Sequence, residues 1–294
     1  MAPPNPDAGS APGQSEETAL AATLQELRAS DRDRFLCALA ASADLRADLA
    51  TLYAFNAEIA GIAEKVSEPM LGLIRLQWWR DALGDIAAGR SHRHQLVQAL
   101  GDISRRRRLD LALLNAMLDA REGDVDPAPP PDLAALETYA AATAGNLSVA
   151  ALEICRRDPS SALRQAARQA GTAYGLVGLM RATPYLARRR IIRLPLAEMQ
   201  AAQSSLDRLC DSKPDAQLPG VVAKVADRAA VLLDSARREK RPADAAAAFF
   251  PGRLARAQLE RLRRHGYDPF RPGAIAGSGL DIWRLLLARW TGRL

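Results

Sequence analysis

Apolar side chains recur at intervals of three and four residues along almost the whole chain. After Asp44, for example, large apolar residues stand at positions 45, 49, 52, 55, 59, 62 and 66. This spacing puts them on one face of a helix, and the strict alternation typical of a half-buried strand is rare in this sequence. The periodicity therefore predicts an all-α fold.

The same pattern, combined with the positions of proline and glycine, predicts where the helices lie. The expected helices span residues 16–28, 31–41, 44–66, 73–86, 94–106, 109–121, 133–154, 161–182, 221–238, 254–264 and 280–290. Pro69 is expected to close the helix 44–66. Pro184 is expected to end the helix 161–182, because the residue before a proline avoids the helical region. We expect residues 1–15 to form a disordered tail and residues 16–294 to form a single helical domain.

Composition limits the setting and the partners of this chain. Of its 294 residues, 48% are hydrophobic and 25% are charged, which is ordinary for a globular protein. The three cysteines are far apart and odd in number, which favours a reducing compartment over a disulfide framework or a zinc site. The net charge of +6 permits an anionic partner such as a membrane surface or a phosphate group. No aromatic residues interleave with the arginine run 105–108, so we expect no nucleic-acid partner.

The stretch from Ala170 to Leu196 has the least common composition in the chain. Gly171, Gly175, Gly178 and Ala182 are spaced by four, three and four residues, which places them on one helical face. Each interior glycine costs a helix about 1 kcal/mol relative to alanine, so this face is expected to serve packing or binding. Between positions 159 and 197 there is no acidic residue, whereas there are seven arginines.

Two passages together resemble the squalene/phytoene synthase family of head-to-head prenyl transferases. The first is LYAFNAEIAGIAE at 52–64, followed by LQWWRDAL at 76–83, and the second is the stretch 170–196 with its ending Leu-Pro. The resemblance extends over nearly the whole chain and implies an isoprenoid (prenyl) synthase-like helical bundle. Members of the family hold magnesium ions between two facing helices and use them to remove diphosphate from a prenyl substrate.

The positions that carry the family's carboxylates have changed here. The first motif, Asp-Asp-x-x-Asp, aligns with Ala60, Gly61 and Glu64, and the second, Asp-x-x-Glu-Asp, aligns with Ala182, Tyr185 and Leu186. Five of the six carboxylates are therefore absent. Magnesium requires oxygen ligands, so no metal, cofactor or catalytic residue is expected, and magnesium would be needed only if the chain were an enzyme. One weak metal site near Glu64, Glu68, Asp81 and Asp85 stays an open alternative, although surface acids on amphipathic helices explain the same spacing.

The sequence is more similar to one branch of this family, which contains the mitochondrial assembly factor of respiratory complex I. Diagnostic pieces are AFN at 54–56, VSE at 66–68 and RATPY at 181–185. This similarity implies a non-enzymatic protein whose partners are complex I subunits or assembly intermediates. The absence of a transit peptide and the composition favour the bacterial cytoplasm, with peripheral contact to the inner membrane. Two alternatives stay open: a prenyl transferase that uses prenyl diphosphates, and a carrier of an isoprenoid or a phospholipid.

Several side chains are candidates for binding roles. We expect a retained, partly apolar cavity with Tyr53, Trp78 and Trp79 as wall candidates, although the small faces would also permit the helices to close on each other. Plain core packing explains the same three residues and is the favoured interpretation for Trp79. Guanidinium groups bind phosphate without metal, so the arginines are candidates for an anion site, with solvation or pairing to acids as the alternative. These anion-binding candidates are Arg75, Arg80, Arg181, Arg188, Arg189, Arg190 and Arg193.

The last expected helix has a separate pattern. Leu280, Trp283, Leu287 and Trp290 form one stripe, and Arg284 lies beside it. Tryptophan at a lipid interface with arginine toward anionic head groups is typical of a peripheral membrane contact. Capping of the domain core explains the same stripe and stays the alternative.

Overall fold

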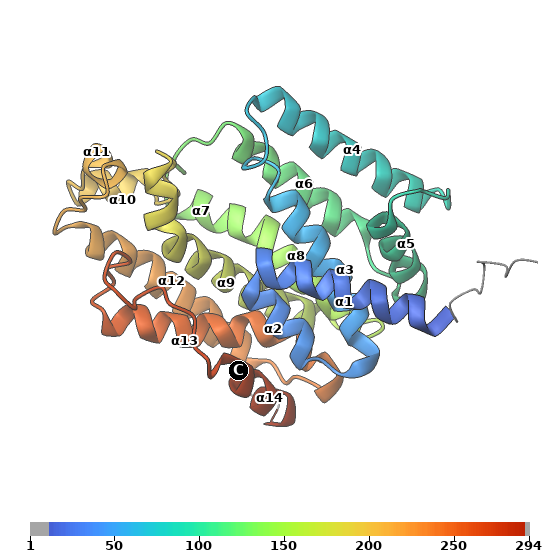
Figure 1. Cartoon of the computed structure of the whole chain (residues 1–294). Helices are drawn as coiled ribbons and strands as arrows, with labels where there is room; N and C mark the ends of the chain where they lie inside the picture. The colour runs from blue at the N-terminus through green and yellow to red at the C-terminus, as the bar shows by residue number, and fades with distance from the viewer. Residues whose placement is uncertain (1–11, 292–294) are drawn as a thin grey trace, which may run out of the picture.

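The chain folds as a set of helices, as the periodicity predicts. The computed structural model describes residues 12–291 and contains no strand within that range (Figure 1). The all-α prediction is confirmed. The helices are α1 (Pro12–Ser30), α2 (Arg32–Ala40), α3 (Ala43–Ala60), α4 (Pro69–Ala87), α5 (Gln95–Arg107), α6 (Leu111–Val125), α7 (Leu133–Ala140), the π-helix η1 (Ala141–Gly145), α8 (Asn146–Cys155), α9 (Ser161–Arg188), α10 (Leu196–Ala201), α11 (Leu206–Cys210), α12 (Leu218–Arg238), the 3₁₀-helix η2 (Ala243–Phe249), α13 (Phe250–Arg264) and α14 (Asp281–Thr291). Most of the predicted tail, residues 1–15, lies outside the described residues, and α1 already includes positions 12–15.

Short polar side chains start several of these helices. The carboxylate of Asp31 accepts a hydrogen bond from the backbone N–H of Arg34, and the hydroxyl of Ser160 accepts one from Leu163. Such caps satisfy backbone donors that the first helical turn leaves without a partner. The N-terminal boundaries of α2 and α9 are therefore fixed locally.

The helix predicted for residues 44–66 ends earlier than expected. Helix α3 stops at Ala60, and the chain turns before Pro69 begins α4. Pro69 therefore starts a helix, whereas the sequence pattern predicted that it would close one. A proline is well accommodated in a first turn, because the N–H that it lacks would have no partner there.

Helix α9 continues beyond the predicted stop. It runs to Arg188 with Pro184 inside it, so the prediction that Pro184 ends the helix is wrong. An interior proline costs about 3 kcal/mol. Thr183, Pro184 and Ala187 are all buried, and the burial of this segment outweighs the local preference. The helix then ends with Arg190 in the left-handed backbone region, at φ 59°.

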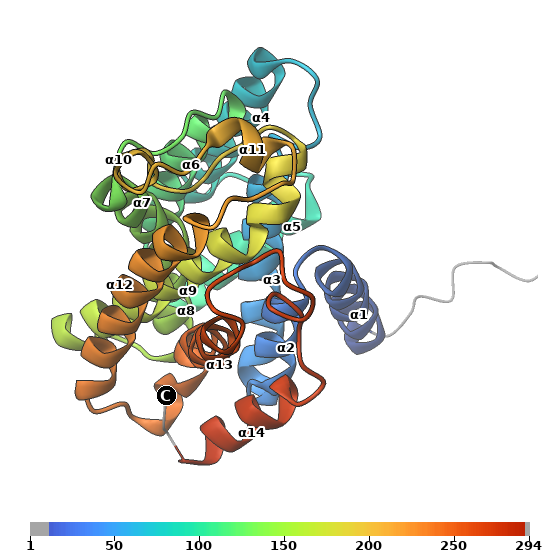
Figure 2. The same ribbon diagram turned by 90° about the vertical axis from the view of Figure 1, so that its left-hand side faces the viewer.

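Helix α9 is the central element of the fold. It contacts α7, η1 and α8 on one side and α12 and α13 on the other (Figures 1 and 2). Buried apolar residues from Leu27 of α1 to Ala288 of α14 form one core cluster. Helices α4 and α14 lie at opposite ends of the molecule in both views. Over the described residues, no helix has both the length and the apolar character needed to cross a bilayer.

Candidate functional site

The two segments that align with the family's carboxylate motifs meet at one point. Glu64 follows the end of α3, and Tyr185 lies on the last turns of α9. The Tyr185 hydroxyl donates to Glu64 Oε2 at 3.3 Å, and Arg189 Nη1 lies 3.2 Å from Glu64 Oε1. Arg189 also donates to the Tyr185 hydroxyl at 3.0 Å. The Glu64–Tyr185–Arg189 contact therefore joins the two aligned segments.

The residues at these positions do not fit a magnesium cage. Glu64 is the one carboxylate among the six aligned positions, and both of its oxygens already have partners within the chain. Of the other acids considered, Asp81 accepts from Gln77 and Asp85 pairs with Arg90. Among the described residues, no three His, Cys, Asp or Glu side chains lie close enough together to hold a metal ion. The contact at Glu64 is an ion pair with a guanidinium group.

The small-residue face of α9 has a closed half and an open half. A Cβ at Gly171 would lie 2.4 Å from the backbone oxygen of Ala144 and from Ser148 Oγ. At Gly175 it would lie 3.0 Å from the Ala144 side chain, whereas at Gly178 no atom lies within 4 Å. Helices α7, η1 and α8 therefore fill the first half, and the second half, at Gly178, is open.

The end of α3 does not close this face. A Cβ at Gly61 would have Ala57 and Lys65 as its nearest neighbours, and both belong to its own segment. The alternative in which the two motif helices fill the space between them is therefore not seen at Gly61. Of the three predicted wall residues, Tyr53 and Trp79 belong to the buried core, and Trp78 is 39% exposed.

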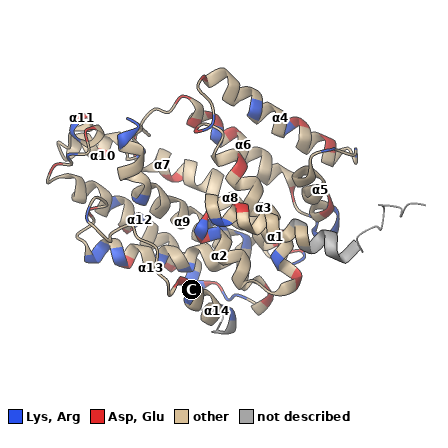
Figure 3. Cartoon of the chain, viewed as in Figure 1, with Lys and Arg blue, Asp and Glu red and all other residues tan. Residues whose placement is uncertain are grey.

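The arginine candidates do not converge on one site. Figure 3 shows basic residues distributed over several helices. Arg80 pairs with Asp119 and Glu122 of α6, at 2.9 and 2.5 Å. Arg193 pairs with Asp124 at 2.6 Å.

The remaining arginines differ in what surrounds them. Arg181 pairs with Asp33 of α2 at 3.0 Å, and Arg190 lies 3.8 and 3.9 Å from Asp207 and Asp211. Arg75 and Arg188 are exposed. Most of the expected members of the anion site therefore pair with acids that are distant in sequence, and anion binding by Arg75 and Arg188 stays a prediction.

A buried polar cluster lies where α2, α3, α9 and α13 meet, and the sequence pattern did not reveal it. Asp33 Oδ2 accepts from Arg181 at 3.0 Å, from Gln258 at 2.7 Å and from the Tyr174 hydroxyl at 3.4 Å. The neighbouring Arg34 is 5% exposed. Its guanidinium lies over the Tyr174 ring, 4.9 Å from the centroid, and 5.8 Å from the centroid of Tyr53. The sequence contained one sign of this cluster. Two charged residues, 33 and 34, lie within a short helix whose other residues are mostly apolar.

Protonation states in this cluster follow from burial and from the nearby charges. Burial is the largest effect on Arg34 and lowers its pKa, but attraction by negative charge, that of Asp31 first, opposes it, and the pKa is raised overall. Burial raises the pKa of Tyr53 and of Tyr174 well above the usual value. The guanidinium therefore stays charged at neutral pH and both phenols stay neutral. Tyr53, an expected binding residue, is 1% exposed and is part of this cluster.

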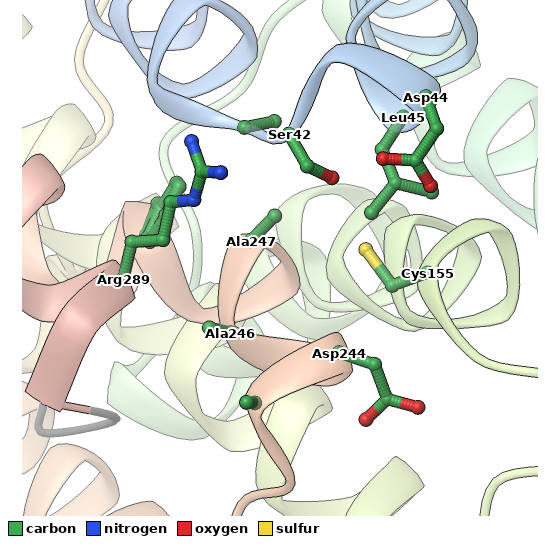
Figure 4. Close-up of a pocket in the computed structure, with 11 residues that line it drawn as sticks. Ser42, Asp44, Leu45, Cys155, Asp244, Ala246, Ala247 and Arg289 are labelled. Carbon is green, nitrogen blue, oxygen red and sulfur yellow. The ribbon is translucent and has the colours of Figure 1, made fainter.

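A small pocket lies beside the last helix, and Figure 4 shows its lining. It has a volume of about 140 Å³, and Arg289 extends toward Ser42 across it. Cys155 also lines it, and burial raises the pKa of this thiol to about 12. The thiol is therefore protonated at neutral pH, and the pocket presents no activated nucleophile.

Three members of the predicted stripe are exposed on the last helix and on the residue before it. Trp283 is 67% exposed, Leu280 60% and Leu287 59%. Leu285 and Ala288 lie on the opposite side of α14 and are buried. The fourth member of the predicted stripe is Trp290, and its side chain lies outside the described part of the structure. Core capping therefore involves the face of α14 opposite to Trp283.

The fold and the altered motif positions define a class, an isoprenoid-synthase-like helical protein. The chain is similar to a solved dehydrosqualene synthase with a TM-score of 0.81 and 17% identity, over 96% of this chain and 99% of that one. It is also similar to squalene synthase HpnC from Alicyclobacillus acidocaldarius, with a TM-score of 0.76, 18% identity and coverage of 87% and 97%. These likenesses confirm the predicted fold.

Sequence similarity shows the family to which the chain belongs. The squalene/phytoene synthase family model matches residues 27–291, and the chain belongs to that family. Among curated proteins it is similar to "NADH dehydrogenase (ubiquinone) complex I, assembly factor 6" of Rattus norvegicus, with 30% identity over 272 residues, 92% of this chain and 81% of the relative. The Homo sapiens protein of the same name is 30% identical over 269 residues, 91% of this chain and 80% of the relative.

Proposed function

We propose that this chain is a catalytically degenerate member of the squalene/phytoene synthase family that acts as an assembly or interaction factor for respiratory complex I. Relatives named as complex I assembly factors, matched along most of their length, support this function. The proposal that the chain is not an enzyme is supported above all by the ion pair of Glu64 with Arg189. A prenyl transferase would need carboxylates at this place that are free to bind metal. Complex I subunits or assembly intermediates are then its partners.

The loss of catalysis follows from electrostatics. Stabilisation of the developing charge on a leaving group is usually the largest catalytic contribution. Arg189 is the cation at the point where the two motif segments meet, and Glu64 neutralises it. Diphosphate departure therefore has no strong electrostatic support at this point. The rival function, a head-to-head prenyl transferase, is favoured by the family and the fold alone.

We place the protein in a bacterial cytoplasm, peripheral on the inner membrane, with the exposed face of α14 as its contact. The exposure of Leu280 and Trp283 supports this placement. A carrier of an isoprenoid or phospholipid is the second candidate function, and the open half of the α9 face, at Gly178, favours it. Lipid that co-purifies with the protein, detected by mass spectrometry, would support the carrier.

The deciding experiment is a gene deletion with complementation. Deletion should reduce assembled complex I on native gels together with its NADH-oxidising activity, and the intact gene should restore both. A Glu64→Gln variant should restore them equally well, because the proposed role needs no carboxylate there. Unchanged complex I in the deletion strain would contradict the proposal.

A second experiment separates this function from the enzyme. The purified protein is incubated with prenyl diphosphates and magnesium, and released diphosphate is measured. We expect no release above the uncatalysed background. Turnover on the order of 1 per second, within the range of ordinary enzymes, would instead establish the prenyl transferase.

A further inference from the structure

The described surface has two exposed apolar faces, and they differ in the charges around them. On α4 the exposed large residues are Met70, Leu71, Leu73, Ile74 and Trp78. On α14 and the residue before it they are Leu280, Trp283 and Leu287. Because the two helices lie at opposite ends of the molecule, one flat surface cannot cover both (Figures 1 and 2).

Five arginines lie on α12, on the segment that follows it, on α13 and on α14, and α13 packs against both α12 and α14. This arginine cluster consists of Arg237, Arg241, Arg253, Arg256 and Arg284. Burial is the largest cause that lowers the pKa of Arg253, and repulsion from Arg256, Arg284 and Arg237 lowers it further. Likewise, burial and then Arg237 lower the pKa of Arg241. The geometry agrees with this repulsion, because α13 contacts both α12 and α14 and the Arg256–Asp234 ion pair links α13 to α12.

Few acids neutralise this arginine cluster. Asp234 pairs with Arg256 at 2.7 Å, and Asp281 pairs with Arg284 at 2.7 Å. Over the described residues, no carboxylate forms an ion pair with the other three arginines of the cluster. Three arginines of the cluster therefore keep a charge that no described ion pair neutralises, and α13, which carries one of them, packs against the exposed helix α14.

The α4 face has a different border. The acidic side chain of Asp81 follows its apolar residues along the same helix and Glu68 precedes them, while Asp85 is paired with Arg90. Arg75 is the basic residue within the apolar segment. This border has no excess of positive charge, so an anionic surface is not attracted to α4.

We propose that the α14 face and the arginine cluster beside it form a docking surface for an anionic phospholipid bilayer. Trp283 and the leucines enter the interfacial region, and the arginines lie among the phosphate head groups. Tryptophan is suited to this depth because its ring is amphipathic, and each arginine near an anionic surface adds attraction that salt screens. The proposal deepens the proposed function, since it specifies the lipid class and the face used at the membrane.

The test is sedimentation of the full-length protein with vesicles. We expect binding to mixed phosphatidylcholine–phosphatidylglycerol vesicles, little binding to phosphatidylcholine alone, and weakening as salt is added. Arg237→Gln should lower the partition coefficient by about fivefold, the contribution of one surface arginine. Trp283→Ser should lower it at least as much, because it removes the interfacial anchor.

Two matched controls test the opposite end of the molecule. Arg75→Gln removes the same charge from α4, and Trp78→Ser removes an exposed tryptophan from it. Neither should change vesicle binding. Equal binding to neutral and anionic vesicles, or a loss in the α4 variants with none in Arg237→Gln, would overturn the proposal.

The outcome is separable from that of complex I assembly. Vesicle binding by the purified protein requires no partner subunit, so it can fail while the gene still complements a deletion strain. Conversely, the protein could bind vesicles normally and still not support complex I assembly. That result would support the docking surface and contradict the proposed function. Far-ultraviolet circular dichroism of each variant checks that the helices are intact.

Discussion

The two halves of the small-residue face of α9 look alike in sequence and differ in the folded chain. At Gly171 the neighbouring helix approaches so closely that its backbone oxygen occupies the place of a side chain. At Gly178, two turns further along, no described atom comes near. The first half stabilises the fold by close helix contact, whereas the second half has no packing partner that explains a glycine. The same residue type therefore reports packing in one half and open space in the other.

Replacement of Gly171 by alanine should have the largest effect. The added methyl would lie 2.4 Å from the Ala144 carbonyl oxygen and the Ser148 hydroxyl, and backbone cannot move aside cheaply. Overpacking of this kind typically costs about 1–3 kcal/mol, and we expect Gly171→Ala to be near the upper end. Urea unfolding followed by circular dichroism measures it. A stability equal to that of the parent protein would remove the distinction between the two halves.

The sequence reached the fold class and most helices because both depend on local periodicity. It misplaced the end of α9 because burial at Pro184 opposes the local preference, and it placed the end of α3 beyond Ala60. It also could not show the pairing of Arg181 with Asp33, because these residues are 148 positions apart. The loss of the carboxylates was visible, but the Glu64–Tyr185–Arg189 contact that stands there was not. Pairing between distant segments is a property of the folded chain.

Replacement of Gly178 by alanine should have the opposite sign. Nothing lies within 4 Å of the added methyl, so the helix gains propensity without a clash. We expect a stabilisation of up to about 1 kcal/mol. Gly84→Ala is the matched control, since Gly84 is also a helical glycine with no atom within 4 Å of its added methyl. A loss of stability in Gly178→Ala alone would mean that the open half is filled in solution.

Replacement of Gly175 by alanine tests the boundary between the halves. Its methyl would lie 3.0 and 3.2 Å from the side chains of Ala144 and Ala140, so both must shift slightly. The gain in helix propensity opposes this strain, and we expect a net change below about 1 kcal/mol. Thermal unfolding beside the Gly171 and Gly178 variants gives the order. We expect the stability of Gly175→Ala to lie between those of the Gly171 and Gly178 variants. A stability outside that interval would contradict packing that loosens gradually from Gly171 to Gly178.

The smallest expected effect concerns the outer end of the open half, where an ion pair and not packing joins the segments. The side chains of Arg189 and Glu64 are 35% and 50% exposed, so solvent screens their attraction. An exposed pair of this kind contributes roughly 0.2–1 kcal/mol. A double-mutant cycle of Glu64→Gln and Arg189→Gln should give a coupling energy in that range, and added salt should reduce it. A coupling energy several times larger would show that this ion pair holds the two segments together strongly. The contrast between close packing at Gly171 and a weak contact at Glu64 would then be wrong.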